Sequence, residues 1–192
     1  MDTYHAVLYV HLLSLFIGVG AASILMVCLF QLRKAQTLME AAPWGGVAGK
    51  IGRAFPVAVL GLFATGAYMT SDVWTWSTGW IDVAIVGLAV IGIQGPLIAE
   101  RTGHKLGQVL MANGPGPLSE EARKMTRHPG LWVVEFTNVA LVLGIVWNMT
   151  QKPSTASAIV CLLIAYAVGL GVALRFMRAP ADASVVVTEP TA

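Results

Sequence analysis

The sequence predicts an all-α integral membrane protein, a polytopic helix bundle with about five transmembrane helices. Of its 192 residues, 56% are hydrophobic and only 11% are charged, whereas soluble domains carry about 25% charged residues. A soluble fold of this composition would expose large apolar patches to water. The formal net charge of +2 is too small to indicate a nucleic-acid partner. We therefore expect most of the surface to contact the lipid bilayer.

Five apolar windows are long enough to cross a membrane, because about 20 apolar residues in a helix span the ~30 Å hydrocarbon core. They lie at about residues 6–32, 54–70, 80–99, 131–149 and 156–176. The first window has no Lys or Arg before it and exceeds the apolar stretch of about 7–15 residues in a signal peptide, so we expect it to be retained. Residues 1–178 are predicted to form one membrane domain, and the tail 179–192 is predicted to be disordered.

The basic residues predict the orientation, because positive charge concentrates in cytoplasmic loops. Only Lys152 lies in a loop on one side, and the other eleven of the twelve lie on the opposite side: Arg33, Lys34, Lys50, Arg53, Arg101, Lys105, Arg123, Lys124, Arg127, Arg175 and Arg178. Aromatic side chains typical of a membrane interface cluster at the less basic ends of the spans: Tyr4, Tyr9, Tyr68, Trp74, Trp76, Trp80 and Trp147. The N-terminus is therefore expected outside and the C-terminus in the cytoplasm.

The basic loops contain short helices of their own. Leu106, Val109 and Leu110 recur at helical spacing beside basic residues, which predicts a helix lying on the membrane surface. The run 113–117 then ends it, and Ser119 is a predicted N-cap.

Proline and glycine mark two further boundaries. Pro129-Gly130 marks the predicted entry to the fourth span, and Pro43-Trp-Gly-Gly46 is the predicted break in the first basic loop.

Two ionisable residues near the outer ends of the spans form the first candidate site. His11 shares a helical face with the small residues Ser14, Gly18 and Ala22, a pattern that allows close helix packing. Asp82 lies near the outer end of the third span. If these spans are neighbours, His11 and Asp82 could bind a metal ion, haem or a proton. The alternative is a packing hydrogen bond for His11 and a water-reaching Asp82.

A second polar cluster lies in the inner half of the predicted bundle. Glu135 and Asn138 are three residues apart in the fourth span, and Gln94 is about as deep in the third. Such a cluster could carry protons or bind a cation. It could equally join helices, with Glu135 paired to Arg53 or Arg127.

Other features are less specific. Cys28 and Cys161 lie within apolar windows and are expected to be small buried side chains, and His104 and His128 lie in a basic loop where solvation is the ordinary outcome. The sequence has no HExxH, GxSxG, Walker or CxxCH motif, which disfavours a hydrolase, a nucleotide-driven pump and a c-type cytochrome.

Two segments carry a family resemblance. The segment Leu8-Tyr-Val-His11-Leu-Leu-Ser-Leu-Phe-Ile-Gly18-Val-Gly20, and the segment Leu60-Gly-Leu-Phe-Ala-Thr-Gly66-Ala-Tyr68 followed by Trp80, resemble a loose group of small bacterial membrane proteins. The group includes the copper-resistance D proteins, the HemJ-type protoporphyrinogen oxidases and an uncharacterised family of predicted integral membrane proteins.

The resemblance implies a bacterial inner-membrane location. A HemJ-like role would imply haem b held partly at His11. HemJ-type proteins pair that histidine with a basic residue in a later helix, whereas the third span here has Asp82 and Gln94. The uncharacterised family is therefore the nearest match, and it implies an architecture without an activity.

Three functional hypotheses follow. The first is an accessory or structural membrane protein that packs against itself or a partner through the small-residue faces of spans one and three. The second is a haem- or metal-binding redox protein that uses His11. The third is a small proton-coupled transporter that uses Glu135 and would need to oligomerise.

Overall fold

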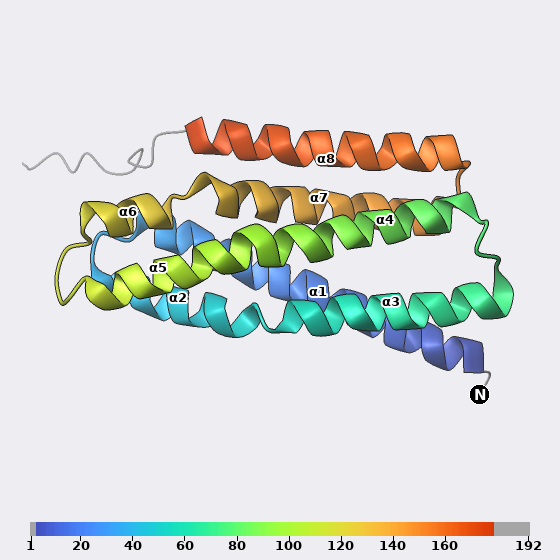
Figure 1. The fold of residues 1–192 in the computed structure, drawn as a ribbon, viewed down its shortest axis with the longest axis horizontal. Helices are drawn as coiled ribbons and strands as arrows, with labels where there is room; N and C mark the ends of the chain where they lie inside the picture. The colour runs from blue at the N-terminus through green and yellow to red at the C-terminus, as the bar shows by residue number, and fades with distance from the viewer. Residues whose placement is uncertain (1–2, 179–192) are drawn as a thin grey trace, which may run out of the picture.

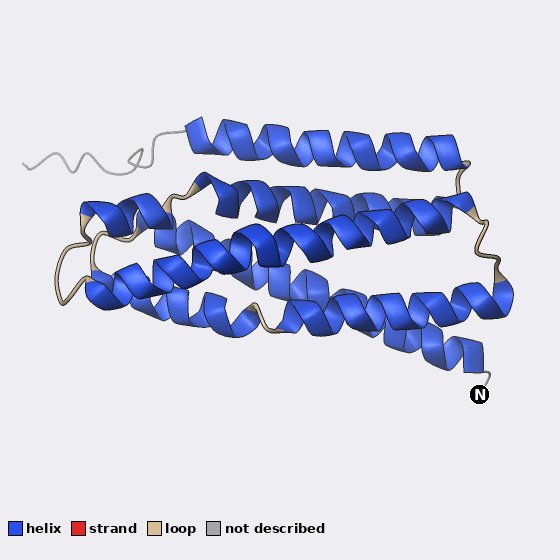
Figure 2. Ribbon diagram, in the orientation of Figure 1, coloured by secondary structure: helices blue, strands red, loops and turns tan. Residues whose placement is uncertain are grey.

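The computed structural model describes residues 3–178, and this part of the chain is helical almost throughout (Figures 1 and 2). The helices are α1 (Thr3–Lys34), α2 (Leu38–Ile51), α3 (Ala54–Val73), α4 (Gly79–Gln94), the π-helix η1 (Gly95–Glu100), α5 (Arg101–Ala112), α6 (Glu120–Thr126), α7 (Pro129–Gln151) and α8 (Thr155–Arg178). Five helical runs are long and apolar enough to cross a membrane, which confirms the predicted multi-pass helical fold. The predicted disordered tail lies outside the described residues.

The helices form an elongated bundle with two distinct ends (Figure 1). One end holds α2, α5 and α6, and we call it the basic end because the eleven clustered Lys and Arg residues lie in or beside these helices or at the C-termini of α1 and α8. The opposite end holds the start of α1 and the α3–α4 and α7–α8 connections. Helix α1 packs mainly against α3, and α7 packs against α8 and α4. Within the described chain, α1 and α4 are not in contact.

Small residues set the close contact between α1 and α3. A Cβ built on Gly18 would lie 3.3 Å from the Cβ of Ala58, and one on Gly61 would meet the Ser14 side chain directly. The small-residue face predicted on the first span is therefore used inside the bundle, against α3.

The α7–α8 pair is joined in the same way. A Cβ on Gly169 would lie 2.7 Å from the backbone oxygen of Phe136, and one on Gly144 would lie 2.9 Å from a methyl carbon of Leu162. Farther along the pair, the amide nitrogen of the fully buried Asn148 donates to the carbonyl of Ala158 at 3.2 Å. These contacts hold α8 against the bundle along its length.

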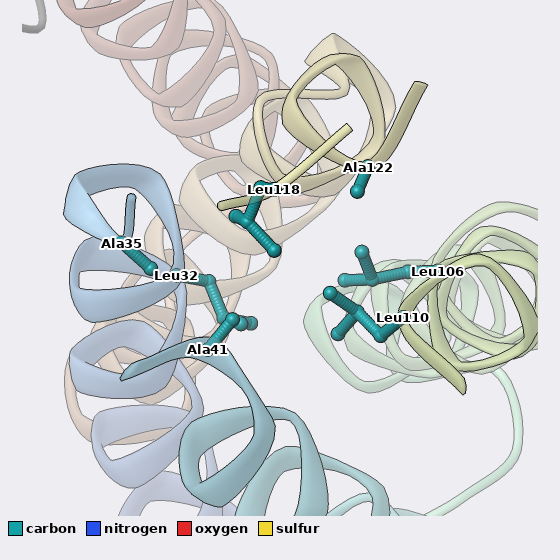
Figure 3. Packing of buried hydrophobic residues seen from close by; sticks show 7 residues of the cluster. All are labelled: Leu32, Ala35, Ala41, Leu106, Leu110, Leu118 and Ala122. Carbon is teal, nitrogen blue, oxygen red and sulfur yellow. The ribbon is translucent and has the colours of Figure 1, made fainter. Parts of the chain in front are cut away.

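A separate hydrophobic cluster fills the basic end. Its side chains converge from α1, α2, α5, the turn before α6, and α6 itself (Figure 3). The buried members are Leu32, Ala35, Ala41, Leu106, Leu110, Leu118 and Ala122. Two backbone bonds fasten the same region, from Leu38 N to Gly116 O at 3.0 Å and from Leu118 N to Gln36 O at 2.9 Å. We call this assembly of α2, α5, α6 and the end of α1 the cap.

The cap corrects one prediction about α5. This helix does not lie across the end of the bundle as a membrane-surface helix would; it continues the direction of α4 through η1 (Figure 1). Leu106 and Leu110 are each only 5% exposed. The helix is amphipathic, as predicted. Its apolar side contacts α1, α2 and α6 of the protein instead of lipid.

A second correction concerns the break predicted at Pro43. Helix α2 runs through Pro43, and the chain is interrupted instead at Gly52–Arg53. A proline inside a helix removes one backbone hydrogen bond. Packing of Trp44 against the cap cluster offsets this loss. The predicted N-cap at Ser119 and the start of α7 at Pro129 are confirmed.

The helical runs are longer than a membrane requires. The run formed by α2 and α3 has 36 residues, and the run from α4 to α5 has 34, or about 54 and 51 Å at 1.5 Å per residue. The hydrocarbon core is only about 30 Å thick. These runs are therefore long enough for the cap to extend beyond the hydrocarbon core.

Candidate functional site

Glu135 is a buried carboxyl group in the basic-end half of α7. Its residue is only 4% exposed, and its Oε1 atom has no hydrogen-bond partner among the described residues. The described chain shows no ion pair between Glu135 and either Arg53 or Arg127, the alternative considered from the sequence. An ionisable side chain that faces the interior of a membrane bundle usually has a functional role.

The two predicted amide partners do meet. Gln94 Nε2 donates to Asn138 Oδ1 and, at 3.2 Å, to Thr137 Oγ1. The Thr137 hydroxyl itself donates to the carbonyl of Val133 at 2.7 Å. These bonds join α4 to α7 one turn from Glu135, but Glu135 is not part of the network. Sequence reasoning missed Thr137, because threonine is common in membrane helices and gives no signal by itself.

A π-helix begins at the same place. Segment η1 follows directly after Gln94, and a Cβ on Gly130 of α7 would lie 3.0 Å from Ile98 of η1. On α7, Glu135 lies between Gly130, which is next to Ile98 of η1, and Asn138, which binds Gln94. Glu135 is therefore at the same height along the bundle as the start of η1. Such π-helical turns are rare and are frequent at functional sites.

Trp132 lies one turn before Glu135 on α7. It is fully buried, with ring centroids of Phe30 and Phe176 at 5.3 and 4.6 Å. The Arg33 guanidinium lies 4.2 Å from the Phe176 ring centroid and donates to the Phe176 carbonyl at 3.2 Å. The indole Nε1 of Trp132 has no hydrogen-bond partner within the described chain.

His11 is held by a residue that the sequence did not single out. Its Nδ1 lies 2.9 Å from Thr65 Oγ1, and the Thr65 hydroxyl lies 2.5 Å from the carbonyl of Gly61. Because that hydroxyl donates its single hydrogen bond to the Gly61 carbonyl, its oxygen accepts a hydrogen bond from the N–H of His11 Nδ1. The opposite ring nitrogen, Nε2, is then left with a free electron pair. The ring also packs close to Gly66, where a Cβ would lie 3.5 Å from His11 Cε1, an ordinary contact distance.

The structure does not bring Asp82 to His11. Asp82 is exposed in the first turn of α4, and α1 and α4 do not touch in the described part. A carboxylate in the first turn of a helix interacts favourably with the positive end of the helix dipole. The joint His11–Asp82 site required neighbouring helices, and α1 pairs with α3 instead.

The other candidate ligands are dispersed. Within residues 3–178, no group of three or more His, Cys, Asp or Glu side chains could hold a metal ion. His104 lies 3.9 Å from the exposed Glu100, and His128 accepts a bond from the backbone of Gly130 at 3.1 Å. Cys28 is buried, as the sequence predicted, whereas Cys161 is only partly buried.

Comparisons of this chain with protein-family models, with curated proteins and with solved structures give no match. Fold and site together define a multi-pass membrane protein with a buried carboxyl group in its interior. Its function is therefore inferred from the side chains of the bundle itself.

Proposed function

We propose that this chain is a multi-pass protein of the bacterial cytoplasmic membrane that moves protons through Glu135, as part of a small proton-coupled transporter. Its N-terminus would lie outside and its basic end in the cytoplasm, as the distribution of Lys and Arg indicates. The observation that carries the proposal is the Glu135 carboxyl group, 4% exposed and with Oε1 unpartnered in the described chain.

Burial of this group is hard to explain by stability alone. A buried carboxylate without a partner opposes folding, and structural carboxylates in membranes pair with basic residues. Asn138 and Gln94 bind each other and leave Glu135 out, so the amide network does not supply that partner. A carboxyl group that gains and loses a proton would account for both the burial and the free oxygen.

A solute pathway would need more than one chain. Five spanning helices pack directly on one another through glycine and alanine contacts, which leaves little room for a channel inside one copy. We therefore place the pathway in an oligomer, with one Glu135 in each copy.

Reconstitution into liposomes tests the proposal. Purified protein in vesicles that contain a pH-sensitive dye should dissipate an imposed pH gradient faster than empty vesicles, and Glu135→Gln should remove the difference. Asp82→Asn is the matched control, because that carboxyl group is exposed at the opposite end, and it should leave the rate unchanged. Equal rates for wild type and Glu135→Gln would refute the proposal.

The accessory role considered from the sequence ranks lower. It relied on the small-residue faces of the first and third spans, and here Gly18 faces Ala58 while Gly87 faces Ile145 and Leu162 within the bundle. The hypothesis stays open to a direct test, which is co-purification of a partner from detergent-solubilised membranes.

A haem-binding role is the second candidate, because the Thr65 bond leaves Nε2 of His11 able to bind iron. His11 would hold the iron through Nε2, and Asp82 would not contribute, because α1 and α4 are not in contact in the described chain. Bound haem would supply one-electron chemistry, while Thr65 would fix the orientation of the imidazole. Absorption spectra of oxidised and dithionite-reduced protein would decide, since a Soret band should shift on reduction and disappear in His11→Ala. A colourless protein from haem-replete cells would exclude this role.

A further inference from the structure

Two buried polar atoms without partners lie on successive turns of α7. Trp132 Nε1 is a hydrogen-bond donor, and Glu135 Oε1 is an acceptor when the carboxyl group is ionised. Their residues are 0% and 4% exposed. Residues three apart on a helix have Cβ atoms about 5–6 Å from each other. The two side chains therefore lie in one small region of the bundle. The indole N–H lacks an acceptor, and the carboxylate oxygen lacks a donor.

We propose that Trp132 and Glu135 together bind a single water molecule, which delivers and removes the proton of Glu135. This inference rests on the proposed function and names the occupant of the same site. A water molecule accepts a bond from the indole N–H and donates one to the carboxylate, so it satisfies both atoms at once. Buried waters typically sit where two or more polar groups would otherwise be unsatisfied.

A metal cation fits this region poorly. Cations such as Na⁺ and Ca²⁺ need several oxygen ligands, and the described chain has no cluster of three metal-binding side chains. The nearby oxygens are engaged, because Asn138 Oδ1 accepts from Gln94 and the Thr137 hydroxyl donates to Val133. Trp132 Nε1 is a donor and would repel a cation. The chemistry therefore selects a neutral, hydrogen-bonding molecule.

The geometry also points to the side from which water arrives. Helix α7 starts at the basic end, so Asn138 lies on the side of Glu135 that faces the opposite end. There the Gln94–Asn138–Thr137 bonds join α4 to α7. Side-chain amides do not gain and lose protons near neutral pH, so in the conformation of the structure this link separates Glu135 from the opposite end, and proton release on that side would require the link to open. Water would enter from the basic end, past η1.

Charged groups near this region do not provide an alternative partner. The Arg33 guanidinium from α1 lies 5.7 Å from the Trp132 ring centroid, but it stacks on the ring and binds the Phe176 carbonyl. From η1, Glu100 is exposed and faces His104 of α5. On α7 itself, His128 binds the backbone of Gly130.

Nuclear magnetic resonance of the full chain in detergent tests the occupant. The protein has six tryptophans, and Trp132→Phe identifies the indole signal of Trp132. We expect that signal to show a cross-peak to a long-lived water, and to move in Glu135→Gln. Trp80 is the control, since it is 9% exposed and lies in the first turn of α4, at the opposite end; its indole should not move. A Trp132 indole without a water cross-peak and insensitive to Glu135→Gln would overturn the inference, as would a saturable shift on adding Na⁺.

Thiol accessibility tests the direction of entry. In a Cys28→Ser, Cys161→Ser background, Glu135→Cys should react with a membrane-impermeant thiol reagent applied to the basic-end side of vesicles, and Asp82→Cys should react from the other side. Reaction of Glu135→Cys only from the side of Asp82 would overturn the proposed path. Neither experiment measures proton flux. The water site can therefore be refuted while proton transport is observed, and it can be supported while proton transport is absent.

Discussion

Gly169 gives the most direct test of the contact between α7 and α8. A Cβ at this position would lie 2.7 Å from the Phe136 backbone oxygen and 2.8 Å from the Thr137 Cα, both backbone atoms that cannot rotate away. Ordinary contact begins at 3.4 Å, so Gly169→Ala should force the helices apart by about 0.7 Å. Overpacking of this kind typically costs about 1–3 kcal/mol.

Gly171 is the matched control, because it lies two residues along the same helix and a Cβ there would meet nothing within 4 Å. Gly171→Ala should gain up to about 1 kcal/mol from helix propensity. Because Gly169→Ala gains the same helix propensity, the two variants should differ by the overpacking cost of about 1–3 kcal/mol in the free energy of unfolding, measured by denaturant titration in one detergent. Equal stability, or a more stable Gly169→Ala variant, would refute the close packing of α8.

Three further predictions concern the cap and the His11 pair. Leu106→Ala should destabilise the cap by about 2–5 kcal/mol because it opens a cavity in the buried cluster. Limited proteolysis should then cut the basic end faster than in wild type. The control Met111→Ala changes an 86% exposed residue and should be cut at the wild-type rate. Ser119→Ala should cost about 1 kcal/mol through loss of the N-cap bond to α6, visible as faster amide exchange in that helix. Thr65→Val should free the His11 ring, so its proton resonances should broaden or shift while the thermal midpoint changes little.

Hydropathy predicted the spans well because the free energy of placing unpaired backbone groups or charges in lipid is large. Every residue of a spanning window contributes to that free energy. Each predicted window, from 6–32 to 156–176, lies within one of the five helical runs that the structure contains. Gln94 and Asn138 could be paired from the sequence for a related reason. Amide side chains in an apolar window need partners, and few were available at the same depth.

Helix pairing could not be predicted in this way. Hydropathy does not distinguish a surface that faces lipid from one that faces another helix, so nothing indicated that α1 would pack on α3 instead of α4. For the same reason His11 was placed with Asp82, whereas its partner is Thr65. The error at α5 has the same origin, because an amphipathic helix can bury its apolar side against a membrane or against protein.

The interruptions at Gly52–Arg53 and at η1 give α1 a special position. Helices α2 and α5 each join their spans through one of these irregular points, whereas α1 runs from Thr3 to Lys34 without a break and ends with Leu32 inside the cap cluster. If the cap tilted, the α2–α3 run could bend at Gly52–Arg53 and the α4–α5 run could bend at η1. Helix α1 has no such point, so it would move as a rigid rod. Since His11 lies on that same rod, a disturbance of the cap at the basic end would be felt as a displacement of the His11–Thr65 contact near the other membrane surface.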